Sequence, residues 1–348
     1  MQKKCVATAA LFAFILLILP IQAQEGMEDK KKVYVCPPCG VDCHDDKYSE
    51  PGVCRVCRME LVVQKKAPKF RVGKNSETVN SNDVRLKASY DAQETSLTFQ
   101  YDPEKITIGT VYQYQKSNID DSHSGNIALY VASNNRLEAL KWRPIQNNPS
   151  HEGHYSATLV TAEMDWKTFS VRRFETSKVD ATGRKLLVAV LQAVPERPQV
   201  IIRFGENEPY TVTIDRYPWH SYDFDFASLN FTFRHLINPE KPFVIGISDF
   251  AFVDGSFRFG NKGTVEIIFV REENRQNILC RKYLIDGPGL ENRGGTIWVS
   301  KEDGYLVEYQ IDLPDERSFK SGKLVLRKIE TVDLESWQYF VKNRRWPE

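Results

Sequence analysis

Two Cys-x-x-Cys pairs near the start of the chain are the residues whose types and spacing point most directly to chemistry. They are Cys36 with Cys39 and Cys54 with Cys57, and 14 residues separate the two pairs. Two-residue spacers place both sulfur atoms of a pair on the same side of a tight turn, so four thiolates can surround one tetrahedral ion. The spacing predicts a metal site with Cys36, Cys39, Cys54 and Cys57 as its ligands.

Disulfide bonds are the main alternative for the same cysteines. The chain contains 7 cysteines, and exported proteins tend to pair their cysteines in an oxidising compartment. We favour a metal because paired Cys-x-x-Cys turns beside Pro51-Gly52 are typical of a metal ribbon. A redox role for Cys36-Pro37-Pro38-Cys39 is disfavoured because no βαβ pattern surrounds it.

The flanking residues extend the motif. Tyr34-x-Cys36-Pro37-x-Cys39 is followed by Pro51-Gly52-x-Cys54-x-x-Cys57-x-Met59-x-Leu61. Together they resemble the bacterial heavy-metal-binding domain, a short module of metal-efflux pumps and adaptors, over residues 33–63. The resemblance implies metal-ion binding. Cys39 stands where that family usually has His, and Arg55 and Arg58 stand where it has Pro and Gly.

The ligand chemistry narrows the choice of metal. Four sulfur ligands favour Zn²⁺ in a closed site, with Cu⁺ or another soft heavy metal as the alternative. Cys43 and His44 lie between the two pairs and have no fixed role in the resemblance. They are either surface groups or accessory ligands. Whether the metal is structural, sensory or cargo stays open.

The first 23 residues predict a secretory signal peptide. Lys3 and Lys4 precede an apolar run over 6–19, and Ile21-Gln22-Ala23 provides a small-residue cleavage site. The apolar run is shorter than the roughly 20 residues that a membrane-spanning helix needs, so we expect no membrane span after cleavage. The sequence therefore predicts export to the periplasm or the extracellular space.

Charge argues against a nucleic-acid partner. Loss of Lys3 and Lys4 with the signal changes the formal net charge from +1 to −1, and no basic stripe follows.

Composition divides the rest of the chain. We expect a charged tether over 24–32, the cysteine ribbon over 33–65 and an antiparallel β domain over 66–348, with one or two subdomains.

Alternation of apolar and polar residues predicts that the long C-terminal part is mainly β. Asp303-Gly304 predicts a tight hairpin turn between strands at 296–299 and 306–311. Further turns are expected at 180–183, 254–255 and 261–263, and an amphipathic helix at the C-terminus carries Leu334, Trp337, Tyr339, Phe340 and Val341. The alternating residues that predict strands are Leu97, Phe99 and Tyr101; Tyr222, Phe224 and Phe226; Leu229, Phe231 and Phe233; and Val265, Ile267 and Phe269.

An antiparallel region of this length must close on itself or stack two sheets, since an open sheet would expose an apolar face and long edges. A barrel, a half-barrel or a sandwich satisfies that condition. The runs at 285–290, 294–299 and 303–304 resemble, faintly, strands of periplasmic lipoprotein-carrier half-barrels, and this resemblance implies no binding residue.

Other residues with chemical potential are scattered. Asp223, Asp225 and Asp249 are either glycosidase-like carboxylates or outward-facing strand residues. His151 and His154 are weak metal candidates in an expected loop. Cys280 is expected to pack as a small apolar residue, and we predict no enzyme because no catalytic constellation is recognisable.

Two functions follow from these patterns. The first is an exported metal-ion-binding protein that uses the four cysteines. The second is a β-domain carrier or scaffold for a hydrophobic ligand or an envelope partner, with the ribbon in a structural role. Trp166, Trp219 and Trp298 are candidates to line an apolar cavity in the second case, or simply to fill the core.

Overall fold

We describe a computed structural model that covers residues 34–35, 47–55, 61–63, 94–142, 155–253, 256–314 and 319–347. A 15-stranded sheet contains most of them, which confirms the prediction of a mainly β fold built on a large antiparallel sheet. A separate three-stranded antiparallel sheet has the order β2-β1-β3. Its strands are β1 (Tyr34–Val35), β2 (Lys47–Tyr48) and β3 (Val62–Val63).

The first half of the large sheet is a meander in which each strand pairs antiparallel with the one before it. A 3₁₀ helix, η1 (Pro103–Lys105), precedes it. The strands are β4 (Thr110–Ser117), β5 (Gly125–Ser133), β6 (Arg136–Trp142), β7 (Tyr155–Asp165), β8 (Ser170–Asp180), β9 (Lys185–Ala193), β10 (Gln199–Phe204) and β11 (Tyr210–Thr213).

The second half returns the chain to its start, because the last strand, β18, pairs antiparallel with β4. The first strand, β12, pairs parallel with β13, and the other neighbours pair antiparallel. The elements are β12 (Trp219–His220), β13 (Phe243–Val253), β14 (Ser256–Arg275), β15 (Ile278–Asp286), η4 (Pro288–Leu290), β16 (Gly295–Ser300), β17 (Leu306–Ile311) and β18 (Gly322–Thr331).

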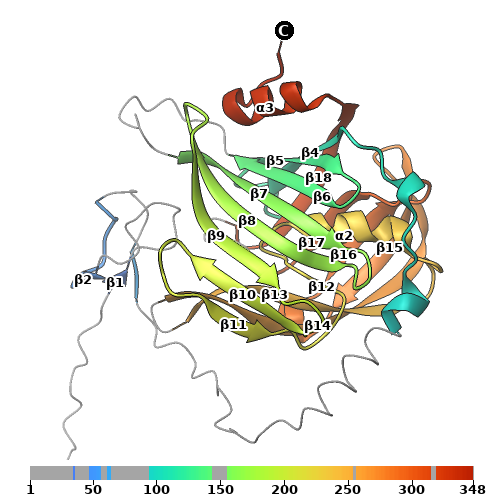
Figure 1. Ribbon diagram of the computed structural model, residues 1–348, viewed down its shortest axis with the longest axis horizontal. Coiled ribbons are helices and arrows are strands. Elements are labelled where there is room, and N and C mark those ends of the chain that lie inside the picture. Colours follow the sequence, from blue (N-terminus) through green and yellow to red (C-terminus); the bar gives the residue numbers. More distant parts are fainter. Residues whose placement is uncertain are drawn as a thin grey trace, which may run out of the picture.

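Part of the outer face of the sheet, over β4 to β8, is covered by the C-terminal helix, α3 (Leu334–Asn343), as Figure 1 shows. The Asp333 side chain caps this helix by accepting a hydrogen bond from the backbone N–H of Ser336 (2.7 Å). Trp337 stacks on Tyr130 of β5, with ring centroids 4.9 Å apart. Both faces of β5 are therefore buried, which explains its continuous apolar run over 127–131. The expected C-terminal helix is confirmed.

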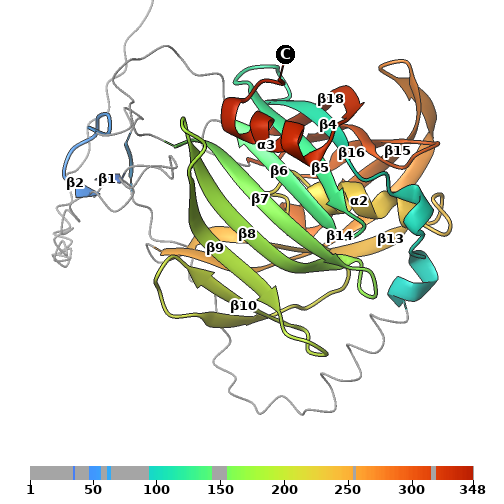
Figure 2. The ribbon, with the colours of Figure 1, turned by 45° about the horizontal axis from the view of Figure 1, so that its top comes forward.

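The inner side of the curved sheet is filled by the chain between β11 and β13. Residues 214–236, which we call the inner segment, contain β12, the helix α2 (Ala227–Thr232) and the 3₁₀ helix η3 (Phe233–His235). Figures 1 and 2 show α2 inside the curve, opposite the face that carries α3. The side chains of Trp219, Phe226, Leu229 and Phe231 are fully buried in the core.

The edge strand β11 of the large sheet approaches the first half of β14 at what we call the seam. The backbone N–H of Phe259 donates to the Tyr210 hydroxyl (2.8 Å), and the Asn261 amide donates to the carbonyl of Thr213 (2.5 Å). No strand pairing joins β11 to β14 within the described part of the chain. The sheet thus closes through side chains rather than through a backbone ladder.

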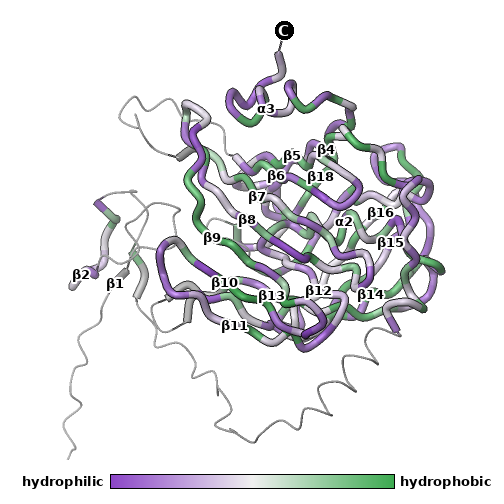
Figure 3. Tube along the Cα trace, viewed as in Figure 1, coloured by the Kyte–Doolittle hydropathy of each residue, from purple (hydrophilic) through white to green (hydrophobic). Residues whose placement is uncertain are grey.

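Strand positions in β14, β16 and β17 agree with the sequence prediction. Val265 and Ile267 of β14 face the core, and hydrophobic and hydrophilic residues alternate along the strands in Figure 3. The hairpin around Gly304 also forms, but its connection spans 301–305. Gly304 alone among these residues has a positive φ (+70°), so the connection is not the tight two-residue turn that we expected.

Three predicted strands are wrong. Residues 94–98 are helical, and Phe99 makes an isolated bridge to Leu236. The aromatic alternation at 222–226 lies in an irregular stretch, and that at 229–233 lies in α2 and η3. The aromatic and apolar residues at 222–226 and 229–233 are buried, so their spacing reflects contact with two walls of the core rather than a strand with one wet face, whereas Leu97 is 69% exposed on its short helix.

The expected turns have different outcomes. The 180–183 turn forms between β8 and β9, with Gly183 at φ +85°. The 261–263 signal instead marks a β-bulge inside β14, where Ile247 pairs with Gly263 and Ser248 pairs with Asn261. Residues 254–255 lie outside the described residues.

Cys280 packs in the core as predicted, with its thiol near the carbonyl of Ile278 (3.3 Å).

Candidate functional site

A carboxylate held between two lysines lies on the inner side of the sheet. Asp225 comes from the inner segment, just before α2. The ammonium groups of Lys116 (β4) and Lys141 (β6) contact its two carboxylate oxygens at 2.6 and 2.5 Å. The Tyr309 hydroxyl of β17 donates to the same carboxylate (3.0 Å). Three strands and the inner segment therefore meet at one ionic group.

Burial makes this contact energetically important. Asp225 is 3% exposed and Lys116 is 5% exposed, and a buried charge is tolerated only when it is paired and hydrogen-bonded. Burial alone would raise the pKa of Asp225, but Lys116 and Lys141 outweigh this effect and hold the pKa below its ordinary value. The carboxylate is consequently ionised at neutral pH.

A second carboxylate fastens the start of the inner segment to β13. Asp249 accepts hydrogen bonds from the Ser221 hydroxyl and from the backbone N–H groups of Tyr222 (3.1 Å) and Asp223 (3.4 Å). Burial, together with the nearby charge of Asp223, raises the pKa of Asp249 well above its ordinary value. Burial also raises the pKa of Asp223 to about 6, although Lys141 and Lys262 oppose the shift.

Of the two alternatives for these three aspartates, the one that makes them outward-facing strand residues is therefore wrong. Asp225 and Asp249 are buried, and all three lie in one cluster, because residues 221–226 form a compact loop rather than a strand. Asp225 and Phe226 both have φ of +52°. Two consecutive residues other than glycine in the left-handed region are unfavourable, so tertiary contacts must hold this loop.

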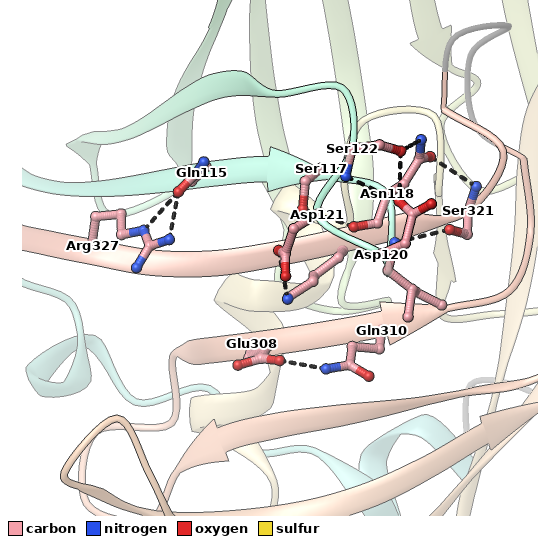
Figure 4. A network of polar contacts seen from close by, with 12 residues as sticks. Gln115, Ser117, Asn118, Asp120, Asp121, Ser122, Glu308, Gln310, Ser321 and Arg327 are labelled. Carbon is pink, nitrogen blue, oxygen red and sulfur yellow. Dashed lines mark hydrogen bonds and ion pairs between the residues drawn. The ribbon is translucent and has the colours of Figure 1, made fainter.

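Aromatic rings and strand ends position the two lysines. The Lys116 ammonium lies 5.2 Å from the Phe319 ring centroid, and the Lys141 ammonium lies 5.6 Å from that of Phe224. Lys116 is the next-to-last residue of β4, and the turn that follows is tied to the segment entering β18. In that turn Asn118 donates to the Ser122 hydroxyl (2.8 Å) and accepts from the backbone of Ser321 (3.2 Å), as Figure 4 shows.

The sequence contains a signal for these lysines, since each continues an inward-facing apolar alternation. In β4, Tyr112 and Tyr114 face the inner core, and Lys116 continues the same alternation. In β6, Leu137 and Ala139 face inwards, and Lys141 follows in register. A lysine at a position that should be apolar on each of two strands indicates a buried ionic site.

The buried histidines do not complete a catalytic group. The Nδ1 atom of His220 contacts the Ser228 hydroxyl (2.9 Å), whereas the Ser221 hydroxyl donates to Asp249. Burial lowers the pKa of His220 to about 3 and that of His235 to about 4, so both imidazoles are neutral. In the described residues, the imidazoles of His220 and His235 bind Ser228 and the backbone of Asp102 rather than Ser221. His151 and His154 lie outside the described residues.

A cavity of about 380 Å³ lies at the seam, which is within the size range of small-molecule sites. Ile247 lines this cavity and also belongs to the inner core. Lys262 is the extra residue of the β14 bulge and lies between the cavity residues Asn261 and Gly263. Its positive charge opposes the upward shift of the pKa of Asp223 and of Asp249. The lining residues are Asp215, Arg216, Gly246, Ile247, Ser248, Asn261, Gly263, Thr264 and Pro288.

The predicted metal ligands are mostly outside the described residues. This holds for Cys36, Cys39, Cys57, Cys43 and His44. Cys54 is described and buried, and its sulfur accepts a hydrogen bond from the Tyr48 hydroxyl (3.5 Å). Within the described ranges, no group of three or more His, Cys, Asp or Glu side chains can hold a metal ion. The four-cysteine ligand set, and Zn²⁺ or Cu⁺ in it, stay a prediction.

Comparison with known proteins finds matches among solved structures, but not among family models or curated proteins. No family model and no curated protein matches the chain. Among solved structures, the Mycobacterium tuberculosis lipoprotein LppX is 11% identical and matches 73% of this chain and 100% of its own, with a TM-score of 0.21. A putative outer membrane lipoprotein-sorting protein domain from Vibrio parahaemolyticus is 9% identical and matches 76% of this chain and 100% of its own, with a TM-score of 0.18. We base no functional argument on TM-scores this low.

The assignment of residues 33–63 to the heavy-metal-binding domain is wrong. No family model matches this stretch, and within the described residues no group of His, Cys, Asp and Glu side chains can hold a metal ion. The resemblance depended on a few cysteines and one Pro-Gly turn, and Cys39, Arg55 and Arg58 already departed from the family pattern. In the described residues, no helix is both long and apolar enough to cross a membrane.

Proposed function

We propose that the protein is an exported carrier or scaffold that binds a hydrophobic molecule on the inner side of its curved sheet. One observation supports this most strongly. Among the described residues, the apolar inner face of the sheet packs mainly against one largely irregular segment, residues 214–236, whose strand β12 has two residues. An apolar ligand can therefore replace residues 221–236 of this segment without breaking a strand pair of the large sheet.

The seam offers an access route for such a ligand. Side chains, not a backbone ladder, tie β11 to β14, and the cavity at this position adjoins the core through Ile247. Separating two hydrogen bonds costs far less than opening a strand pair of full length. Entry at the seam leaves most of the large sheet intact.

Binding of a neutral apolar probe tests the proposal. N-phenyl-1-naphthylamine becomes fluorescent in apolar surroundings, and we expect saturable binding to the full chain that a long-chain alcohol displaces. Fluorescence that rises without saturation, or that the alcohol leaves unchanged, would contradict the proposal.

Two tryptophan variants of β14 locate the site. Thr264 lines the seam cavity, and Glu266 is an exposed residue two positions further along the same strand. We expect Thr264→Trp to fill the cavity and weaken probe binding about tenfold or more, and Glu266→Trp to leave it unchanged. Equal affinities of the two variants would place the site elsewhere.

A further inference from the structure

The opposite charges of the ionic group around Asp225 come from two different parts of the fold. Both cations, Lys116 and Lys141, come from strands of the large sheet, whereas the anion comes from the inner segment. Strands β4 and β6 are held on both sides by antiparallel neighbours. The two ammonium groups therefore belong to the fixed wall, and the carboxylate belongs to the part that a ligand would displace.

Residues 225–231 of the inner segment resemble an amphiphile, because an anionic group is followed by apolar side chains. The carboxylate of Asp225 is followed directly by Phe226, and then by Leu229 and Phe231, and all three apolar side chains are fully buried in the core. The stretch thus presents an anionic group at the lysines and an apolar body behind it. A fatty acid or a similar molecule has the same order of groups.

The loop that carries Asp225 is poised to move. Asp225 and Phe226 have left-handed backbone angles that side chains other than glycine rarely adopt, so leaving this conformation relieves strain. Exchange of one carboxylate for another between the same two lysines also preserves the charge balance of the buried site.

From these observations we propose that Lys116 and Lys141 form a head-group site for an anionic amphiphile, and that Asp225 occupies this site when no ligand is bound. The inference rests on the proposed function, since it assumes that a hydrophobic ligand enters the inner side of the sheet. It adds the chemical class of the ligand: an acyl or similar apolar body that ends in a carboxylate or a comparable anion.

A matched pair of probes tests the inference. A fluorescent long-chain fatty acid and its methyl ester share the apolar body, and only the acid carries a charge. We expect the unaltered protein to bind the acid about tenfold more tightly than the ester, because hydrogen bonds to charged groups are the stronger ones. Equal affinities for acid and ester would overturn the inference.

Variants of the lysines and of Asp225 assign the preference to this site. We expect Lys141→Gln, at a side chain that is 17% exposed, to bring the ratio of acid to ester affinity close to one. Asp225→Asn should raise the affinity for the acid and not for the ester, because it removes the internal competitor. An unchanged ratio in both variants would overturn the inference.

A control separates these effects from the loss of any buried carboxylate. Glu308 is buried in β17 and is bound by Arg275 (2.5 Å), away from the inner segment. Glu308→Gln should leave the ratio of acid to ester affinity unchanged.

If Asp225→Asn is too unstable for titration, its melting temperature gives a second readout. We expect the acid to raise this melting temperature more than the ester does. Equal shifts with acid and ester would count against the site.

The outcomes also distinguish the inference from the proposed function. Saturable binding of N-phenyl-1-naphthylamine and of the ester, without any preference for the acid, would keep the carrier function and reject the head-group site. Absence of binding by all three probes would reject the carrier function itself.

Discussion

Asp223 is the residue of the buried cluster whose charge changes in mild acid. Burial raises its pKa from an ordinary value of 3.8 to about 6, against the opposing effect of Lys141 and Lys262. The folded protein therefore holds a proton on Asp223 that the unfolded chain has already released between about pH 4 and pH 6. Its stabilising contribution is complete below pH 4 and is lost as the pH rises through 6.

The direction of this pKa shift gives a prediction for Asp223→Asn. We expect the free energy of unfolding of the unaltered protein to fall with rising pH relative to that of the variant, between about pH 4 and pH 6. Urea unfolding of both proteins at several pH values measures the difference. Parallel pH profiles would mean that Asp223 titrates as in the unfolded chain.

The cysteines allow a separate prediction at the residue scale. We expect protein purified under reducing conditions to contain about one zinc ion per chain, and Cys36→Ser to lose it, because a tetrahedral site needs all four thiolates. Cys280→Ser is the control, since Cys280 lies in the core of the large sheet. Elemental analysis measures the metal, and metal-free protein with its N-terminal cysteines in disulfides would contradict the prediction.

At the scale of elements, the sequence was informative where one face of an element meets water. The strands β14, β16 and β17 and the helix α3 have one polar face or a clear turn, so their periodicity or turn signals predicted them. The inner segment has no polar face, and its aromatic residues at 222–233 gave a false strand pattern. The charged site was missed because Lys116 and Lys141 meet Asp225 only after closure of the sheet.

The attachment of α3 gives a prediction about stability. Trp337 is fully buried, stacks on Tyr130 and donates its indole N–H to Glu138 (2.7 Å). We expect Trp337→Ala to lower the free energy of unfolding by about 3 to 5 kcal/mol. Tyr339→Ala, on the same helix at a residue that is 37% exposed, should change it by less than about 0.5 kcal/mol. Similar losses in the two variants, measured by chemical denaturation, would contradict this packing.

Most of the described chain belongs to one 15-stranded sheet that curves around residues 214–236. The sequence indicated an antiparallel region that must close, and left a barrel, a half-barrel and a sandwich open. The choice depends on contacts between distant residues, such as Tyr210 with Phe259 and β18 with β4, which local patterns do not encode. The seam and the inner segment follow from this closure, and the proposed carrier function depends on both.

Hydrogen exchange of the full chain, with and without a saturating long-chain alcohol, tests this central claim most directly. If the ligand replaces the inner segment, amide exchange over residues 221–236 should increase on binding, while exchange in α3 and in the β5 and β6 strands beneath it stays unchanged. Binding of the alcohol with no change over 221–236 would contradict the account.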